Sequence, residues 1–500
     1  MSADTVLIAN RGEIAVRVIR ACRETGRRAV AVYSEVDRDA LHVRLADEAV
    51  CLGPPAPQAS YLDVQKIIAA ARRTGADAVH PGYGFLAENA AAAQAIEDSG
   101  LTWIGPSPAS IAAVGDKLRA RQLAREAKVP VIPGSSESLV ERAAVEQVAR
   151  QIGYPLLLKA VGGGGGRGIR LVEQASTLAS DLERAMGEAQ SAFGQGAVYV
   201  ERFVSPGRHI EVQILGDGQG NAIHLGEREC SLQRRQQKVV EETPSPFVDP
   251  ELRERMGAAA VALAKAVHYR GAGTVEFLVD PERRFYFLEV NARLQVEHPI
   301  TEQVTGIDLV RAQLEIAERG AMPFGQDAWQ PRGHAIELRV NAEDPLRGFA
   351  PSTGLVTGLR LPAGPFVRVD TALQEGDEVT PYYDSLIAKL AVWGRDRAEA
   401  VERWAAAAAA FSLGSVSTTL PLAPILAADA EFQAAEFHTG WLVPWVKALS
   451  PEPELSEAQR QAVAIAAALA AHDLRAARPV ADPPGGLSPW VLAARRKQLR

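Results

Sequence analysis

The stretch 276–297 constrains this chain more than any other part of the sequence, because it predicts a β-hairpin that carries acidic residues. Two apolar, β-prone runs, Val275–Val279 and Phe285–Leu288, flank the turn-forming segment Asp280–Arg284. Short β-prone runs on both sides of turn-forming residues are typical of a hairpin. The sequence therefore predicts two antiparallel strands whose facing residues can be counted from the turn.

A turn that is symmetric about Glu282 and Arg283 would place Glu276 directly opposite Glu289. Two facing carboxylates repel each other, and the pair is costly unless a cation lies between them. With the amide of Asn291 they form a set of hard oxygen ligands, which suits Mg²⁺ bound together with substrate phosphates. The hairpin therefore predicts a magnesium site, and a solvated face on an edge strand is the alternative.

Polar and apolar residues alternate strictly from Glu289 to Glu297. Alternation is typical of a strand with one apolar and one polar face. Phe285 and Phe287 share the parity of the polar residues, so we expect the strand to leave the core and to turn a functional face outward at its end. That face would carry Glu289, Asn291, Arg293, Gln295 and Glu297.

Composition places the chain among globular proteins that do not bind nucleic acid. Five hundred residues predict roughly three or four domains. The net charge of −7 and the pI of about 5.8 argue against a basic nucleic-acid surface. Three cysteines far apart, without a CxxC motif, indicate a reducing compartment. The N-terminus does not resemble a signal peptide and no apolar run is long enough to span a bilayer, so we expect a cytoplasmic protein without a membrane partner.

Strand and helix patterns alternate from residue 5 to residue 104 and predict an α/β fold that begins with a doubly wound parallel sheet. No GxGxxG motif follows the first strand, so a dinucleotide site is not expected.

Five glycines at 162–166 lie between two strand-like runs. A glycine hairpin can bring backbone N–H groups close to phosphates and close over a ligand, while a flexible linker is the alternative.

Ten motifs in family order make the chain resemble the biotin carboxylase subunit of biotin-dependent carboxylases, in the ATP-grasp superfamily. They cover about residues 4–445 and read IANRGEIAVRVIRAC (8–22), HPGYGFLAEN (80–89), IGPSP (104–108), GDK (115–117), KAVGGGGGRG (159–168), GRHIEVQ (207–213), GERECSLQRRQQKVVEE (226–242), LEVNARLQVEHPITE (288–302), LRVNAEDP (338–345) and PYYDSLIAKL (381–390).

The resemblance implies a particular order of domains. An ATP-grasp lid and an α+β central domain would follow the N-terminal sheet, and a β-rich domain would end the matched region. The implied bounds are 1–114 for the N-terminal domain, 115–133 for a helical linker, 134–204 for the lid, 205–333 for the central domain, 334–446 for the C-terminal domain and 447–500 for a tail that could dock a partner.

The resemblance also implies residues that bind MgATP. Glu276, Glu289 and Asn291 would hold Mg²⁺ or Mn²⁺, in agreement with the hairpin argument. Gln236 stands where relatives often have histidine, and glutamine can still donate and accept hydrogen bonds. The implied nucleotide contacts are Lys117, Lys159, Gly163, Gly164, Gly165, Gly166, Gly168, Glu201, Arg202, Phe203, Val204, His209, Gln233 and Gln236, together with Glu276 and Glu289.

The implied reaction uses ATP and bicarbonate to carboxylate biotin through carboxyphosphate. Glu297 would be the base that deprotonates bicarbonate, and Arg339 would stabilise the biotin enolate. Tyr83 would lie near biotin. Bicarbonate would be held by Arg293, Gln295, Val296 and Lys238.

The implied partners are a biotin carboxyl carrier protein and a carboxyltransferase subunit, which selects the acyl-CoA or 2-oxo acid. A homodimer is implied too, with Arg17, Glu24 and Arg368 at its interface. None of the four methionines adjoins a lysine, so we expect biotin on a separate protein. Another ATP-grasp ligase, of the carbamoyl-phosphate or carboxylate-amine type, and a non-catalytic scaffold are the alternatives.

Overall fold

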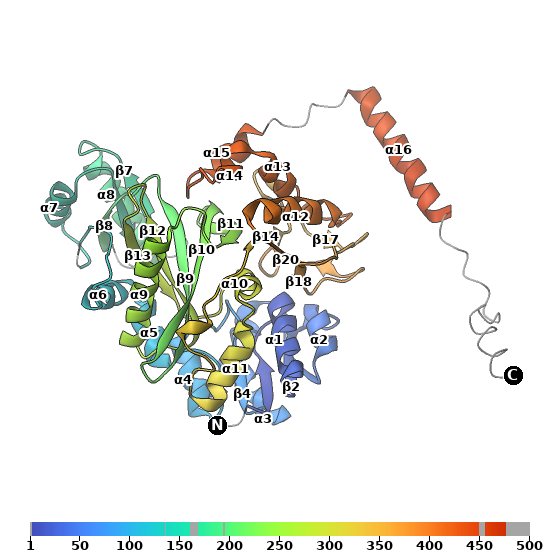
Figure 1. The fold of residues 1–500 in the computed structure, drawn as a ribbon, viewed down its shortest axis with the longest axis horizontal. Coiled ribbons are helices and arrows are strands. Elements are labelled where there is room, and N and C mark those ends of the chain that lie inside the picture. The colour runs from blue at the N-terminus through green and yellow to red at the C-terminus, as the bar shows by residue number, and fades with distance from the viewer. Residues whose placement is uncertain (1–2, 136, 161–168, 194–195, 450–455, 477–500) are drawn as a thin grey trace. The chain divides into compact units, whose positions relative to one another are not determined.

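The computed structural model describes residues 3–135, 137–160, 169–193, 196–449 and 456–476. It divides into two compact units, 1–446 and 447–500. The first unit begins with the predicted doubly wound parallel sheet, which lies in the blue part of the ribbon in Figure 1. The strand order of this sheet is β3-β2-β1-β4-β5. Its strands are β1 (Thr5–Ile8), β2 (Arg28–Ser34), β3 (Glu48–Gly53), β4 (Ala78–His80) and β5 (Thr102–Trp103), and its helices are α1 (Gly12–Glu24), α2 (Leu41–Leu45), α3 (Val64–Thr74) and α4 (Ala90–Asp98).

Helices α5 (Pro108–Gly115) and α6 (Lys117–Glu126) lead from this sheet to a small antiparallel sheet of order β7-β6-β8. The predicted glycine hairpin joins β6 to β7 but lies outside the described residues. Leu156 and Leu158 of β6 pack with Val145 of α7 and Leu182 of α8 in a separate apolar core. The elements of this part are α7 (Arg142–Ile152), β6 (Leu156–Ala160), β7 (Ile169–Val172), α8 (Leu178–Phe193) and β8 (Val198–Arg202).

An eight-stranded sheet of order β13-β12-β9-β10-β11-β14-β20-β18 forms the centre of the first unit. It crosses the predicted boundary at residue 334, because β11 pairs with β14 through Glu241 and Glu337. Its strands are β9 (Arg208–Asp217), β10 (Ala222–Arg234), β11 (Gln237–Thr243), β12 (Arg270–Val279), β13 (Phe285–Asn291), β14 (His334–Asn341), β18 (Val367–Thr371) and β20 (Leu386–Gly394), and the associated helices are α9 (Pro250–Ala266), α10 (His298–Thr305), α11 (Leu309–Arg319) and α12 (Arg397–Ala410).

The strict alternation of β14 gives this sheet two different faces. Ile336, Leu338 and Val340 belong to an apolar core that includes Trp404 of α12. On the other face Ala335 packs with Ile300 of α10, and Glu337 and Arg339 share the parity of Ala335. Because successive side chains of a strand point to opposite faces, α10 covers a face that carries charges and α12 covers an apolar one.

The remaining elements of the first unit are short, and their helices contribute Leu422, Phe432 and Leu442 to the apolar core that includes Trp404. They are the two-stranded pairs β15 (Glu343–Asp344) with β16 (Ala350–Pro351) and β17 (Gly354–Leu355) with β19 (Glu378–Val379), and the helices α13 (Leu422–Ala428), α14 (Ala430–Gln433) and α15 (Leu442–Ala448).

The second unit contains α16 (Glu457–Ala476). The backbone N–H of Ser456 donates to Gln459 Oε1 at 2.8 Å, and the N–H of Gln459 donates to Ser456 Oγ at 3.3 Å. This reciprocal pair is a capping box. Ile465 and Leu469, one helical turn apart, are both exposed. Within the described part of the chain, no helix is long and apolar enough to cross a membrane.

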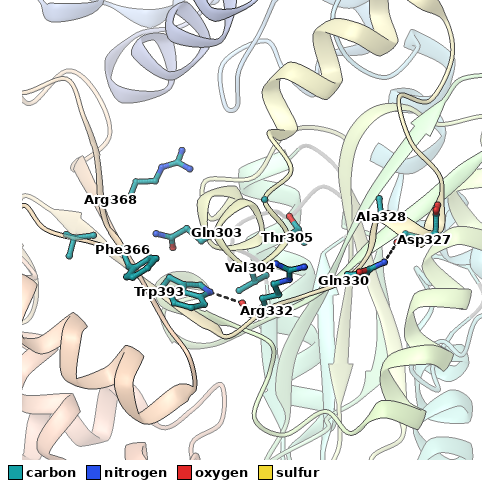
Figure 2. Close-up of a pocket in the computed structure, with 12 residues that line it drawn as sticks. Gln303, Val304, Thr305, Asp327, Ala328, Gln330, Arg332, Phe366, Arg368 and Trp393 are labelled. Carbon is teal, nitrogen blue, oxygen red and sulfur yellow. Dashed lines mark hydrogen bonds between the residues drawn. The ribbon is translucent and has the colours of Figure 1, made fainter.

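A surface hollow of about 780 Å³ lies beside α10. Phe366, Arg368, Arg332 and Trp393 are among the residues that line it, as drawn in Figure 2. The Trp393 indole N–H donates to the Arg332 carbonyl at 2.7 Å, and the Phe366 and Trp393 ring centroids lie 4.7 Å apart. Arg17, which the resemblance assigned to a dimer interface, is buried in its own chain against Glu302 and Asp308. Arg368 also contacts Glu302, at 2.7 Å.

Candidate active site

The β12–β13 hairpin confirms the predicted opposition of Glu276 and Glu289, but not the symmetric turn. Val279 pairs with Phe285, so the turn is centred on Glu282 alone. A β-bulge then shifts the register by one residue, and beyond it Glu276 pairs with Glu289. The bulge leaves Leu288 unpaired between Phe287 and Glu289. One extra residue reverses the facing of all later side chains, so it turns Glu289 away from the apolar side of Phe287.

The predicted strand from Glu289 to Glu297 is too long. β13 ends at Asn291, and residues 292–297 form an irregular segment that leads into α10. Where the segment leaves the sheet, Glu88 in the loop before α4 accepts hydrogen bonds from the Ala292 N–H at 3.1 Å and from Arg293 Nε at 2.9 Å. Glu297 therefore occupies the N-cap of α10 rather than a strand end.

Most of the predicted nucleotide and bicarbonate residues line one cavity of about 540 Å³. A neighbouring cavity of similar volume contains Tyr83 and Glu13 and shares part of the same wall, namely Lys238, Arg293, Val296 and Arg339. The predicted residues in the first cavity are Lys117, Lys159, Glu201, Arg202, Phe203, Val204, His209, Gln233, Gln236, Lys238, Glu276, Glu289, Asn291, Arg293, Gln295, Val296 and Arg339. Gly163–Gly166 and Gly168 lie outside the described residues.

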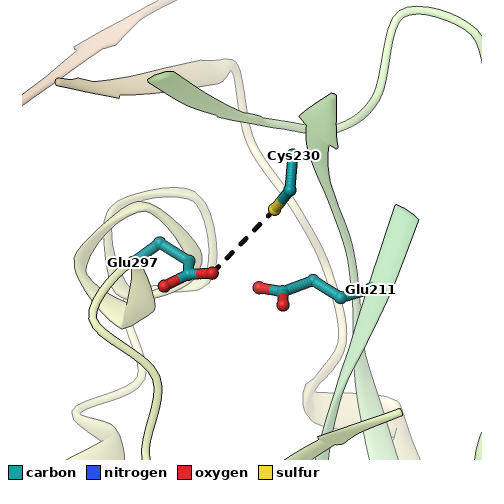
Figure 3. A group of neighbouring side chains, drawn as sticks. All are labelled: Glu211, Cys230 and Glu297. Carbon is teal, nitrogen blue, oxygen red and sulfur yellow. Dashed lines mark hydrogen bonds between the residues drawn. The ribbon is translucent and has the colours of Figure 1, made fainter. Parts of the chain in front are cut away.

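The Lys238 ammonium lies among three carboxylates at the junction of the two cavities. Its Nζ is 2.5 Å from Glu211 Oε2, 2.7 Å from Glu297 Oε1 and 2.9 Å from Glu276 Oε1. Figure 3 shows Glu211 and Glu297 converging with the Cys230 thiol, which donates to Glu297 Oε1 at 3.9 Å. These three side chains resemble a metal-ligand set, but the lysine already supplies the cation that the two carboxylates need.

Glu297 is completely buried and contacts a different cation with each oxygen. Oε1 accepts from Lys238, and Oε2 accepts from Arg339 at 2.8 Å. Burial alone would raise the pKa of Glu297, but Lys238, Arg339 and then Arg228 hold it well below its usual value. The side chain is therefore an ionised carboxylate at neutral pH, which is the state in which a carboxylate can accept a proton.

The hairpin carboxylates fit a divalent cation. Glu289 opens into the cavity, yet it lies deep among protein atoms, and this burial and the charge of Glu276 raise its pKa. Glu276 is bound by Lys238 and by the Asn291 amide at 2.7 Å, and His209 Nε2 lies 2.8 Å from its second oxygen. Two carboxylates and one amide at a cavity wall form the hard ligand set expected for Mg²⁺.

Some predicted contacts are occupied by protein partners. Lys159 forms an ion pair with Glu201, which also binds Arg121. Arg293 bonds to Glu88 and, through another nitrogen, to Gln295 Oε1 at 2.5 Å. These bonds fix the orientation of the Arg293 guanidinium, and part of its hydrogen-bonding capacity is used by protein groups.

Sequence reasoning missed several buried charges that support these residues. Glu211 and Arg228 join through Oε1 and Nε at 2.5 Å, and Glu241 binds Arg339 Nε at 2.6 Å. The available signal was a charged residue at a position where a buried strand should be apolar.

Fold, site and comparisons together define the class of this protein as an ATP-dependent ligase. Family models match the chain as the biotin carboxylase N-terminal domain at residues 2–111, the ATP-binding domain of the carbamoyl-phosphate synthase L chain at 116–323, and the biotin carboxylase C-terminal domain at 337–443. The biotin carboxylase of Nostoc sp. is 52% identical over 424 residues, which cover 84% of this chain and 94% of the relative.

Two solved structures extend the comparison. The biotin carboxylase domain dimer of the Hydrogenobacter thermophilus 2-oxoglutarate carboxylase, in complex with MgADP, ADP and bicarbonate, matches with a TM-score of 0.84 and 45% identity, over 90% of this chain and 99% of that one. The Campylobacter jejuni biotin carboxylase in its β-γ-ATP complex matches with a TM-score of 0.85 and 42% identity, over 89% and 99%. The chain belongs to the biotin carboxylase family, whose members are ATP-dependent ligases.

Proposed function

We propose that this chain uses ATP and bicarbonate to carboxylate biotin that a separate carrier protein presents. The observation that carries the proposal is the position of Glu297. It is fully buried and lines neither cavity, but it joins Lys238 to Arg339, which both line the wall that the two cavities share. ATP and bicarbonate would enter the cavity that contains Glu276 and Glu289. Biotin would enter the cavity that contains Tyr83.

In the first step Glu297 takes the proton of bicarbonate, and a bicarbonate oxygen attacks the γ-phosphorus while ADP leaves. Arg293 and Gln295 would orient the anion. The low pKa of Glu297 depends mainly on the neighbouring charge of Lys238. A bicarbonate anion bound to Lys238 would offset part of that charge, and the pKa of Glu297 would then rise. Mg²⁺ held by Glu276, Glu289 and Asn291 would neutralise charge on the phosphate oxygens.

In the second step carboxyphosphate breaks into CO₂ and phosphate, and the phosphate takes the proton from biotin N1. The negative charge moves to the ureido oxygen, where the Arg339 guanidinium can stabilise it. N1 then attacks CO₂. Arg339 suits this role because its second donor group is anchored by the buried Glu241, which fixes the guanidinium plane.

Purified protein with MgATP, bicarbonate and free biotin tests this proposal. ADP release should require bicarbonate and should accelerate with biotin. Turnover that is indifferent to both compounds would contradict it and would favour another ATP-grasp ligase.

The proposal includes partners and location. A biotin carboxyl carrier protein would deliver biotin and a carboxyltransferase subunit would use the product, in the cytoplasm. The described cysteines are free thiols, which supports a reducing compartment. We also propose a homodimer through the hollow of Figure 2, where Phe366 is exposed, while Arg17 and Arg368 bind Glu302 within their own chain. Sedimentation that gives a monomer at micromolar concentration would contradict the dimer.

A further inference from the structure

Lys389 is a fully buried cation for which the proposed chemistry has no role. It lies on β20, in the apolar sequence LIAKLAVWG. Removing an ammonium group from water is costly, and an unpaired lysine at such a position would lose its proton or destabilise the fold. The contacts of this side chain therefore indicate what it stabilises.

The Lys389 ammonium contacts three segments that are far apart in the sequence. It donates to the Val296 carbonyl at 3.0 Å. It lies 3.2 Å from Glu13 Oε2 on α1 and 3.8 Å from Asp370 Oδ2 on β18. The first contact is the important one, because Val296 belongs to the irregular segment 292–297, which carries the residues proposed to bind and deprotonate bicarbonate.

Lys389 and Arg339 hold the same short segment from neighbouring strands. They are directly opposite each other in the β14–β20 ladder. Arg339 binds the side chain of Glu297, whereas Lys389 binds the carbonyl of the peptide that joins Val296 to Glu297. Because a peptide unit is planar, fixing this carbonyl also fixes the backbone N–H and Cα of Glu297.

The same lysine reaches the second cavity. Glu13, its ion-pair partner, accepts a hydrogen bond from the Tyr83 hydroxyl, and the ammonium lies 5.9 Å from the centre of the Tyr83 ring. Burial, partly offset by Lys389, raises the pKa of Glu13 to about 7. One ammonium therefore links the segment of Glu297 to a wall of the second cavity.

We propose that Lys389 is a positioning residue that sets the backbone of Val296 and Glu297 for bicarbonate and ties this segment, through Glu13, to the cavity wall at Tyr83. The inference rests on the proposed function, because it names the residue that orients the proposed base. Lys389 itself touches no reacting atom and acts through the Val296 carbonyl.

The test compares steady-state kinetics of the full-length wild type and Lys389→Met, which keeps the length of the side chain and removes the donor. Loss of a charged hydrogen bond predicts a roughly 10–100-fold lower kcat/KM for bicarbonate. The KM for ATP should stay within about twofold of the wild type, because Lys389 does not line the nucleotide cavity. Lys389→Arg keeps a donor and should give a value between the two.

Arg397→Met is the matched control. Arg397 is a half-buried cation on α12 that binds the buried Glu242 on the other face of β14 and β11, so its loss removes an ion pair without touching residues 292–297. It should lower stability and leave the ratio of the two KM values unchanged.

Two outcomes would overturn the inference. In the first, Lys389→Met has the same kinetic constants as the wild type. In the second, Lys389→Met loses kcat/KM for ATP and for bicarbonate in the same proportion, as Arg397→Met does. If Lys389→Met does not fold, Lys389→Arg carries the test, and a wild-type kcat/KM for bicarbonate would overturn the inference. A wild type that turns over ATP without bicarbonate would instead contradict the proposed function.

Discussion

Glu241 and Glu242 are neighbours on β11 and both are buried, yet they enter opposite faces of the sheet and meet opposite electrostatic conditions. Glu242, on the α12 side, is bound by His334 at 2.7 Å and by Arg397 at 2.7 and 3.2 Å. Burial raises its pKa, but these partners outweigh burial and lower the pKa to about 2.

Glu241, on the α10 side, shares its cation. Arg339 binds one oxygen of Glu241 and also binds Glu297, while the other Glu241 oxygen has no hydrogen-bond partner among the described residues. Burial raises the pKa of Glu241 to about 7, since Arg339 only partly offsets it and Glu297 adds to it. Glu337 lies directly opposite on β14, and burial raises its pKa as well.

The comparison separates two uses of a buried charge. On the α12 face Glu242 has partners of its own, Arg397 and His334, and a buried carboxylate with its own partners avoids a net cost. On the α10 face several carboxylates share the same cations. An anion that binds there can therefore draw a cation away from one carboxylate and change the pKa of that carboxylate. Perturbed acids that share a cation such as Arg339, which lines the cavity wall, are the pattern of a functional site.

Glu297→Gln should have the largest effect, because it removes the proposed base and keeps the shape. We expect a loss of about 10²–10⁴-fold in biotin carboxylation, with nucleotide binding retained. Activity and binding of a fluorescent ATP analogue should be measured on the same sample. A loss of less than about threefold would mean that the base lies elsewhere.

Glu242→Gln should instead reduce stability and spare the kinetics. Breaking a buried ion pair typically costs about 3–5 kcal/mol. Because the pKa of Glu242 is depressed to about 2, its stabilisation is complete above its ordinary value near 4.5 and is lost as the pH falls toward 2. Urea unfolding of both proteins from pH 8 to pH 4 should show a constant difference that begins to shrink below about pH 4.5. A changed KM for bicarbonate would contradict the separation of the two faces.

Glu289→Gln should raise the Mg²⁺ concentration needed for half-maximal ATP turnover by roughly tenfold or more, since it replaces a charged ligand with a neutral one. Titration with Mg²⁺ at saturating ATP measures the shift. An unchanged requirement would remove Glu289 from the metal site.

Glu241→Gln should produce the smallest effect and the opposite pH trend. The raised pKa means that folded protein binds more protons than unfolded protein between about pH 4.5 and 7, so ionised Glu241 opposes folding as the pH rises. Relative to the wild type, this variant should therefore gain about 1 kcal/mol or more in stability between pH 5 and pH 8. A loss over that interval would contradict the account of shared cations.

Local sequence patterns predicted the hairpin, the facing carboxylates and the parallel sheet, because each depends on residues close together in the chain. The bulge at Leu288 left no trace in the alternation, so the symmetric turn was wrong although the pair was right. The pairing of Glu241 with Glu337 joins strands almost a hundred residues apart, and no local periodicity reports such a register.

The most direct test follows ¹⁴C-labelled bicarbonate into free biotin in the presence of MgATP, for the wild type, Glu297→Gln and Glu242→Gln at a temperature where all three are folded. The account predicts ATP-dependent carboxybiotin from the wild type and Glu242→Gln, and almost none from Glu297→Gln. Equal labelling by all three proteins, or no labelling by a wild type that still hydrolyses ATP, would contradict it.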